Sequence, residues 1–432
     1  MKSFVRSSAL CGLLALACAC APKPYGPVPS EQQFAWQDLE YYMFCHFGPN
    51  TFTGMEWGLG TEEEDIFAPT DLDCAQWART AKAAGMKGII LTAKHHDGFC
   101  LWPSAYSTHT VAQRAWRDGA GDVLKDLSEA CRAEGILFGV YISPWDRNHP
   151  AYGTDEYNDV FAKSIAEVHS KYGPVFEQWF DGANGGAKIP AYDWPLFYEA
   201  VYKHSPNAVI FSDIGPGCRW IGNERGRAGE TNWCRLDVEG FAPGTMAPGA
   251  DTLNCGNCQG GSWIPGEADV SIYKGWFYSK AGESTRKSVD DLMELYFSSV
   301  GRNANLLLNV PPDTTGHINP ADSARLVEFR AAREAYFANR TASGRHCGAV
   351  TTLKTSAPSK CIVLCEDIRY GQRISSFKVE AKADGGWEEI AAGTTIGHKR
   401  ILRFDEPVPA GRIRVSVTGS YEKPLIKSIE LF

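Results

Sequence analysis

Short apolar segments alternate with amphipathic segments over most of this chain, from about residue 36 to residue 338. The segments between the amphipathic ones read as strands. Strands that alternate with helices favour a parallel sheet, and at this length a (β/α)8-like barrel is preferred over a doubly wound sheet, because no glycine-rich nucleotide loop follows the first strand. Apolar residues at three- and four-residue spacing predict helices over 72–84, 121–134, 157–171, 195–204 and 289–300.

The strand-like segments share a second property, because each of them ends in polar or charged residues. In a parallel barrel the loops that follow the strands lie at one end, so these side chains are expected to gather in one pocket. Residues 41–44 lead to His46, residues 88–93 to Lys94-His95-His96-Asp97, residues 137–142 to Trp145-Asp146, and residues 209–211 to Ser212-Asp213.

The segment Val175–Gly182 ends in Asp181, which follows Trp179 and Phe180 and precedes a glycine. This position suits a buried nucleophile, although a carboxylate at a strand end can also simply cap the next turn. Glycoside cleavage with retention needs two carboxyl groups about 5 to 5.5 Å apart. The partner of Asp181 should come from a later loop, and the residues alone leave Glu224 and Glu230 equally suitable.

Aromatic residues are abundant, with 13 Trp, 17 Tyr and 21 Phe among 432 residues. Flat aromatic faces stack on sugar rings and line ligand pockets, and Glu56-Trp57-Gly58 is interpreted as part of a pocket rather than of the core. The formal net charge of −8 gives no basic face for nucleic acid, so no nucleic-acid partner is expected.

The chain changes character after Asn339. Short strand-like segments separated by Gly, Pro and Asp turns predict an all-β sandwich over residues 340–432, following a barrel over residues 30–338. The expected strands cover residues 362–364, 376–381, 400–404, 412–417 and 426–432.

Residues 1–21 are interpreted as a targeting segment outside the fold. Lys2 and Arg6 form a positively charged N-terminal region, and residues 9–19 form an apolar stretch that is too short to span a bilayer. Cleavage after a small residue is one outcome, and acylation of Cys18 or Cys20 as a lipoprotein is favoured. The protein is therefore expected to be exported, to the periplasm or the cell envelope, and to touch a membrane only through this anchor.

Eleven of the 14 cysteines follow the targeting segment, and most are expected to be unpaired small apolar residues. Cys255 and Cys258 have metal or redox spacing. No second pair follows at zinc-ribbon distance, so a local disulfide is preferred there over zinc. The cysteines in apolar or strand-like surroundings are Cys45, Cys100, Cys131, Cys361 and Cys365.

Several motifs over residues 36–338 occur in a fixed order, among them His46-Phe-Gly, Lys94–Phe99 and Trp179–Gly182. They resemble, in order, those of the α-L-fucosidases of glycoside hydrolase family 29. The resemblance implies a (β/α)8-like fucosidase that needs no cofactor. The Ser143–Asn148 phrase and the Gly222-Asn223-Glu224 loop are similar to the branch that acts on α-1,3/1,4-linked fucose of branched Lewis-type glycans. The matching motifs are His46-Phe-Gly, Glu56-Trp57, Lys94–Phe99, Tyr141, Trp179–Gly182, Gly275–Tyr278 and Ser299–Pro312.

The resemblance also implies roles for individual residues. Asp181 would be the nucleophile and Glu224 the acid/base of a double displacement, with Glu230 as the fallback. Trp276 would lie against the methyl group of fucose. The other residues expected to bind the substrate, a fucosylated oligosaccharide or glycoconjugate, are His46, Glu56, Trp57, His95, His96, Tyr141, Trp145, Asp146 and Trp179.

Two alternatives to a branch-selective enzyme are a fucosidase of broad linkage specificity and a non-catalytic fucose-binding protein. A metal is not expected, because adjacent histidines on one strand, such as His95 and His96, would point to opposite faces. The C-terminal module resembles a galactose-binding-like sandwich through runs such as Phe377–Glu380 and Gly386–Ile390. It is expected either to bind glycan or to pack against the barrel.

Overall fold

The computed structural model describes residues 22–113, 116–186, 191–346 and 348–432. The targeting segment expected at residues 1–21 lies outside the described residues. No helix in the described part of the chain is both long enough and apolar enough to cross a membrane.

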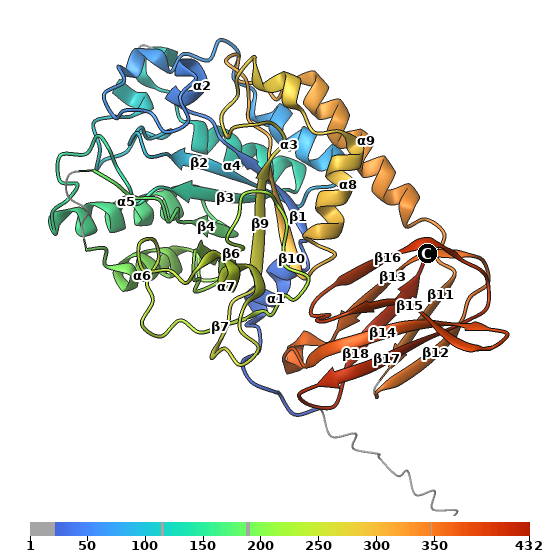
Figure 1. The fold of residues 1–432 in the computed structure, drawn as a ribbon. Helices are drawn as coiled ribbons and strands as arrows, with labels where there is room; N and C mark the ends of the chain where they lie inside the picture. Colours follow the sequence, from blue (N-terminus) through green and yellow to red (C-terminus); the bar gives the residue numbers. More distant parts are fainter. Residues whose placement is uncertain (1–21, 114–115, 187–190, 347) are drawn as a thin grey trace, which may run out of the picture.

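The first domain is a closed barrel of eight parallel strands, which confirms the predicted fold class (Figure 1). The strands follow the order β1-β10-β9-β6-β5-β4-β3-β2 around the barrel. Met43 of β1, for example, lies beside Ile89 of β2 and Leu308 of β10. Their bounds are β1 (Tyr41–Cys45), β2 (Gly88–Lys94), β3 (Leu137–Ile142), β4 (Glu177–Trp179), β5 (Val209–Ser212), β6 (Cys218–Trp220), β9 (Gly266–Ser271) and β10 (Ala304–Asn309).

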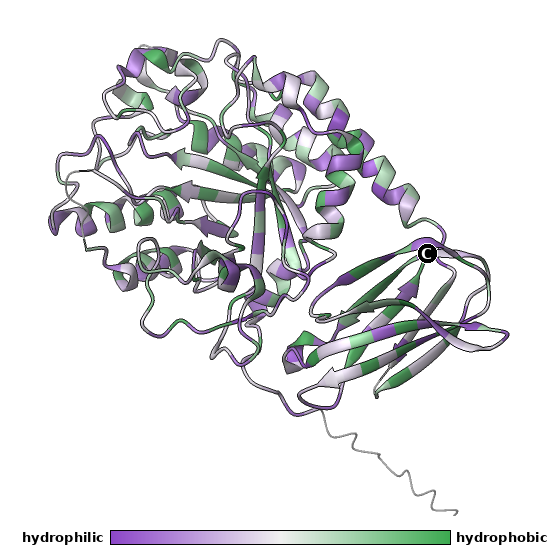
Figure 2. Ribbon diagram, in the orientation of Figure 1, coloured by the Kyte–Doolittle hydropathy of each residue, from purple (hydrophilic) through white to green (hydrophobic). Residues whose placement is uncertain are grey.

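Helices surround the barrel, and the predicted ones are found within about two residues of their expected ends. Side chains of Asp73, Asp122, Asp193 and Ser288 accept backbone N–H groups at the helix starts, which explains where α3, α4, α6 and α8 begin. Figure 2 shows hydrophobic and hydrophilic residues alternating along these helices, as expected when one face packs on the barrel. The helices are α1 (Glu31–Gln37), α2 (Pro49–Thr53), α3 (Cys74–Ala83), α4 (Val123–Glu134), α5 (Glu156–Tyr172), α6 (Trp194–His204), α7 (Ala250–Cys255), α8 (Val289–Ser298) and α9 (Pro320–Tyr336).

One side of the barrel departs from the regular alternation of strand and helix. Residues 213–217, all of them described, connect β5 to β6 without a helix. The long segment 221–265 between β6 and β9 instead contains α7 and the paired strands β7 (Arg235–Leu236) and β8 (Ser262–Trp263). The segment after β6 therefore has one short helix in place of a long one, and its remaining residues can shape a pocket.

The barrel interior contains a pair of fully buried carboxyl groups, Glu177 and Glu267. The Trp36 indole donates a hydrogen bond to Glu177 over 2.7 Å, and Trp179 donates to Glu267 over 2.8 Å; the Tyr42 hydroxyl also donates to Glu267. Burial, and then the charge of Glu267, raise the pKa of Glu177 well above its usual value. The hydrogen bond to Glu267 therefore fixes the indole of Trp179, the last residue of β4, from the barrel interior.

The second domain is a β-sandwich of two four-stranded antiparallel sheets, as predicted. The sheet orders are β11-β18-β13-β16 and β12-β17-β14-β15, and their apolar faces enclose a separate core that includes Ile362, Phe377 and Ile429. The strands are β11 (Ala342–His346), β12 (Val350–Lys354), β13 (Ser359–Glu366), β14 (Ile374–Ala383), β15 (Gly386–Gly393), β16 (Arg400–Val408), β17 (Arg412–Ser420) and β18 (Ile426–Leu431).

The sandwich is bonded to the barrel loop that follows β6. Thr231 donates to the Thr394 hydroxyl over 2.9 Å, the Asn232 backbone N–H donates to the Thr395 hydroxyl over 2.9 Å, and the Cys234 N–H donates to the side chain of Gln372. These contacts tie residues 231–234, in the first third of that loop, to the second domain.

Ten cysteines of the described residues are free thiols, and Cys255 and Cys258 are among them. Cys45, Cys100, Cys131 and Cys361 are buried, in keeping with their expected apolar surroundings, and Cys365 is half-buried.

Candidate active site

The loops that follow the barrel strands enclose a cavity of about 400 Å³. Asp181, directly after β4, and Glu224, in the loop after β6, both line it. Two candidate catalytic carboxyl groups thus face one space. The remaining lining residues are Trp179, Gly182, Ala183, Phe211, Asp213, Trp220, Gly244, Ala247, Pro248, Ala250, Leu253 and Asp269.

Asp181 is held by donors on both of its carboxylate oxygens. The Tyr141 hydroxyl donates to Oδ2 over 3.0 Å, and the Ala183 backbone N–H donates to Oδ1 over 2.7 Å. Nε2 of His96 lies 3.7 Å from Oδ2. The side chain is about one quarter exposed, so the carboxylate is oriented and still open to the cavity.

Glu224 has a different environment. The indole N–H of Trp276 donates to its Oε2 over 3.3 Å. Partial burial raises the pKa of Glu224 more than this hydrogen bond lowers it, and the negative charges of Asp181 and Glu56 add to the rise. A carboxyl group with a raised pKa beside a fixed carboxylate is the combination that suits an acid paired with a nucleophile.

Glu230, the fallback candidate, lies elsewhere. Its carboxylate forms ion pairs with Arg302 and Arg400, where the barrel meets the sandwich. Burial alone would raise the pKa of Glu230, but the hydrogen bond and charge of Arg400, with Arg302, lower it. Glu230 does not line the cavity that contains Asp181.

His95 and His96 lie side by side, and the expectation that they point to opposite faces is wrong. β2 ends at Lys94, so the alternation of a strand does not continue into these residues. Their ring centroids are 4.1 Å apart. Burial lowers the pKa of both rings, and it lowers that of His46 to about 3, so all three are neutral at neutral pH.

An aromatic wall joins the histidines to Asp181 and Glu224. His46 lies 5.0 Å from Trp276, and His95 stacks on Tyr141 at 5.6 Å, measured between ring centroids. Tyr141 in turn stacks on Trp179 at 5.3 Å. The wall therefore brings together residues from the ends of five strands.

Glu56 and Trp57 lie at the rim. Glu56 accepts a hydrogen bond from the Trp276 backbone N–H over 2.9 Å, which ties the loop after α2 to the loop after β9. The Trp57 side chain is 54% exposed and packs edge-on against His96 and Trp145. An exposed indole at this rim is available to contact a ligand.

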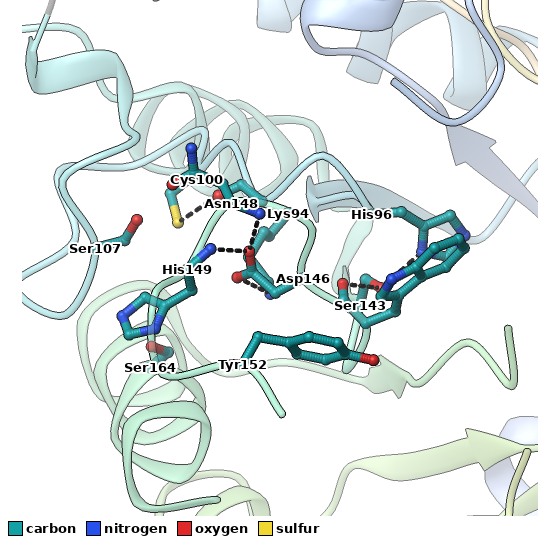
Figure 3. Close-up of polar contacts among 12 residues, drawn as sticks. Lys94, His96, Cys100, Ser107, Ser143, Asp146, Asn148, His149, Tyr152 and Ser164 are labelled. Carbon is teal, nitrogen blue, oxygen red and sulfur yellow. Dashed lines mark hydrogen bonds and ion pairs between the residues drawn. The ribbon is translucent and has the colours of Figure 1, made fainter. Parts of the chain in front are cut away.

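Asp146, which is expected to bind substrate, is held by contacts within the protein (Figure 3). The residue is buried and does not line the cavity. One oxygen pairs with Lys94 at 2.8 Å, and the other accepts the backbone N–H groups of Asn148 and His149. Its oxygens are thereby occupied, and Asp146 holds the turn that places Trp145 against the His96 ring, 4.8 Å away.

A family model described as "Alpha-L-fucosidase" matches residues 23–331, most of the chain. This chain is an α-L-fucosidase. It belongs to glycoside hydrolase family 29, as the solved structures show.

A putative α-L-fucosidase 1 from Oryza sativa subsp. japonica is 40% identical, over 95% of this chain and 86% of that protein. A glycoside hydrolase 29 family member from an unknown rumen bacterium has a TM-score of 0.89 at 41% identity, over 95% of this chain and 78% of that one. A Ruminococcus gnavus family 29 fucosidase, solved in complex with fucose, has a TM-score of 0.85 at 30% identity, over 95% and 96% of the two chains.

Asp213, Trp220 and Asp269 also line the cavity of the fucosidase. The sequence places Asp213 among the polar residues that gather in the pocket, but it gives none of the three a catalytic or binding role. Asp213 follows a predicted strand, and burial raises its pKa to about 6. Trp220 and Asp269 lie on β6 and β9, strands that the sequence pattern does not reveal, and the Trp220 indole donates to Asp269 over 3.0 Å. The position of Asp213 after a predicted strand could have identified it, whereas no local pattern marks Trp220 or Asp269.

One group of side chains in the described part of the fucosidase could bring ligand atoms together at a metal ion: Glu177, Cys218 and Glu267, within 4.8 Å of one another. The Trp36, Tyr42 and Trp179 donors already occupy these carboxyl groups. The group is thus explained by its protein partners.

Proposed function

We propose that this α-L-fucosidase is a retaining enzyme that releases α-1,3/1,4-linked fucose from branched Lewis-type glycans. The observation that carries the mechanism is the shared cavity of Asp181 and Glu224. Tyr141 and the Ala183 N–H hold Asp181, while burial raises the pKa of Glu224. A nucleophile and a proton donor need such unlike environments.

In the first step, an oxygen of Asp181 attacks the anomeric carbon of fucose, and the bond from that carbon to the glycosidic oxygen breaks. Glu224 gives its proton to the departing oxygen. In the second step, the Glu224 carboxylate takes a proton from water, and the water oxygen attacks the anomeric carbon. The bond to Asp181 breaks, fucose is released, and both side chains return to their starting states.

The histidines and aromatics have binding roles in this proposal. His46, His95 and His96 offer ring nitrogens to the hydroxyl groups of the sugar. A 6-deoxy sugar also needs an apolar wall for its methyl group, and the half-buried indole of Trp276 provides one next to Glu224.

The preference for a branched substrate has its own support. The cavity extends past Asp181 and Glu224 to Trp220, Ala247 and Leu253, on β6 and in the long segment before β9. This space offers an aromatic and apolar surface for the sugars that remain on the leaving side. Binding energy from a second sugar raises the rate only for substrates that carry it.

The test compares fucose release from a Lewis-type trisaccharide, from 2'-fucosyllactose and from an aryl fucoside. We expect the Lewis-type substrate to have a much higher kcat/KM than 2'-fucosyllactose. Equal rates on the two would show a fucosidase of broad linkage specificity and refute the proposed preference, while the aryl fucoside reports the hydrolytic machinery independently.

We also propose that the fucosidase is exported as a lipoprotein. The support is the sequence of residues 1–21, with Lys2 and Arg6 before an apolar stretch that reaches Cys18 and Cys20. Mass spectrometry of the mature N-terminus distinguishes the outcomes. An acylated cysteine at the first position supports the proposal, and an unmodified residue after Ala17 or Ala21 contradicts it.

A further inference from the structure

Asn309 is the last residue of β10 and is fully buried. Its side-chain oxygen accepts the His46 backbone N–H over 3.2 Å and contacts Nδ1 of His46 at 2.9 Å. Its side-chain nitrogen donates to the backbone carbonyl of Trp276 over 2.7 Å and to the Ser271 hydroxyl over 2.9 Å. A single amide thus links the ends of β1 and β9 to the loop that carries Trp276.

These contacts determine which way the amide points. The backbone N–H of His46 can only donate, and the carbonyl of Trp276 can only accept. Exchanging the amide oxygen and nitrogen would place like groups against each other at both positions. The oxygen must therefore face His46, and Nδ1 of His46 must carry a proton in order to bond to it.

A neutral imidazole has one protonated nitrogen, so Nε2 of His46 carries a lone pair. Among the described residues, the His46 ring forms a hydrogen bond through Nδ1 and none through Nε2. The ring lies in the aromatic wall, with Trp276 and His95 at centroid distances of 5.0 and 5.7 Å.

His96 shows the same arrangement by a separate route. The Ser143 hydroxyl donates its single proton to the Trp145 carbonyl over 2.8 Å, so its oxygen must accept from Nδ1 of His96, 2.8 Å away (Figure 3). Two of the three pocket histidines thus carry their proton on Nδ1, and Nε2 of His96 lies 3.7 Å from Oδ2 of Asp181.

We propose that Asn309 is a positioning residue that holds His46 in the Nδ1–H tautomer, so that Nε2 accepts a hydrogen bond from a hydroxyl group of the sugar. The substrate part of this inference rests on the proposed role of His46 in binding fucose. The tautomer part depends only on Asn309 and His46. Because burial lowers the pKa of His46 to about 3, the ring stays neutral over the working range of pH.

The experiment uses 15N-histidine NMR together with aryl-fucoside kinetics, on the wild type and on Asn309→Ala, Asn309→Asp and Asn305→Ala. The His46 signals are assigned with a His46→Gln variant. Asn305 is the matched control, because it is a buried asparagine on the same strand whose amide donates to the Trp36 carbonyl over 2.7 Å and does not contact His46.

We expect wild-type His46 to show a protonated Nδ1 and an unprotonated Nε2. In Asn309→Ala the proton is no longer held on Nδ1, so Nε2–H should become populated and KM should rise, with kcat/KM falling by up to about 100-fold. In Asn309→Asp the buried carboxylate should raise the pKa of His46 and move the acid limb of kcat/KM to higher pH. Asn305→Ala should leave the His46 spectrum and the acid limb unchanged.

A protonated Nε2 in the wild type would overturn the inference, and so would an Asn309→Ala variant with the wild-type His46 spectrum. If the tautomer changes while kcat/KM matches that of Asn305→Ala, the link between the tautomer and substrate binding is wrong. Asn309→Asp keeps an acceptor for the His46 N–H groups and provides the pH readout even if Asn309→Ala folds poorly. The NMR result does not depend on linkage preference or on the identity of the acid/base, so failure of the proposed function remains distinguishable.

Discussion

Replacing Asp146 with Asn should destabilise the barrel and weaken catalysis although Asp146 does not line the cavity. The change keeps the shape of the side chain but removes its charge. Lys94 would then be a buried ammonium group without its counterion, since both side chains of the pair are only 4–5% exposed. An amide nitrogen would also face either Lys94 or the N–H groups of Asn148 and His149, all of which are donors.

The magnitude follows from this burial. Ion pairs on the surface contribute about 0–1 kcal/mol, whereas removing one partner of a buried pair costs about 3–5 kcal/mol. With an unfolding entropy of about 2.1 cal/mol/K per residue over the roughly 300 residues that unfold with the barrel, the expected fall in Tm is about 5–8 °C.

The assay is thermal unfolding followed by circular dichroism, with aryl-fucoside kinetics on the same samples. Glu134→Gln is the matched control, because Glu134 pairs with Lys82 at 3.1 Å on the surface and should change the stability by less than about 1 kcal/mol. The double variant Lys94→Met, Asp146→Leu should recover part of the loss, because it leaves no unpaired buried charge.

The difference should also depend on pH. Burial would raise the pKa of Asp146, but the charge of Lys94 and the hydrogen bonds outweigh it and leave the pKa below 3.8. A depressed pKa contributes stability above the unfolded value that is lost as the pH falls through the folded value. The gap between wild type and Asp146→Asn should therefore be full near neutral pH and shrink below about pH 3.8. A Tm fall no larger than that of Glu134→Gln at neutral pH would refute the reasoning.

The remaining predictions concern the two carboxyl groups of the cavity. Asp181→Gly should lose nearly all activity with its fold intact, and added azide should restore turnover through a β-fucosyl azide; near wild-type activity would exclude Asp181 as the nucleophile. Glu224→Ala should slow glycans with poor leaving groups by about 100- to 10,000-fold and aryl fucosides far less, while Glu230→Ala should mainly lower stability through loss of the Arg302 and Arg400 pairs. Because Glu224 must be protonated to act, kcat/KM should fall as the pH rises through its raised pKa, and a basic limb that persists in Glu224→Gln would contradict this assignment.

The barrel could be predicted from the sequence because most of its strands are continuous apolar runs separated by helices with clear caps. β6 and β9 could not be predicted, because both contain buried charged residues that interrupt the apolar pattern. Arg219 on β6 is buried by hydrogen bonds to the Leu253 carbonyl and to Asn232, and β9 contains Glu267 and Asp269. The hydrogen-bond partners of these charged groups lie far away in the sequence. A local sequence pattern therefore cannot show that such groups are buried.

The site was predictable to a similar degree. The rule that polar residues after strands meet in one pocket correctly brought Asp181 and His96 together. The rule does not show that the carboxylate of Asp146 pairs with Lys94 at the end of the neighbouring strand β2. The residues alone leave Glu224 and Glu230 equally suitable, and the resemblance to the family favours Glu224. The ion pairs of Glu230 with Arg302 and Arg400 form only in the folded chain.

The hydrogen bonds between the sandwich and the loop after β6 constrain how this enzyme can evolve. That loop carries Glu224 near its start and, seven to ten residues further on, is bonded to Thr394, Thr395 and Gln372 of the second domain. Loss or exchange of the sandwich by recombination would release residues 231–234, which follow the acid/base candidate closely in the chain. The two domains are therefore expected to be inherited as one unit, and new linkage preferences to arise by substitution within the loop rather than by domain shuffling.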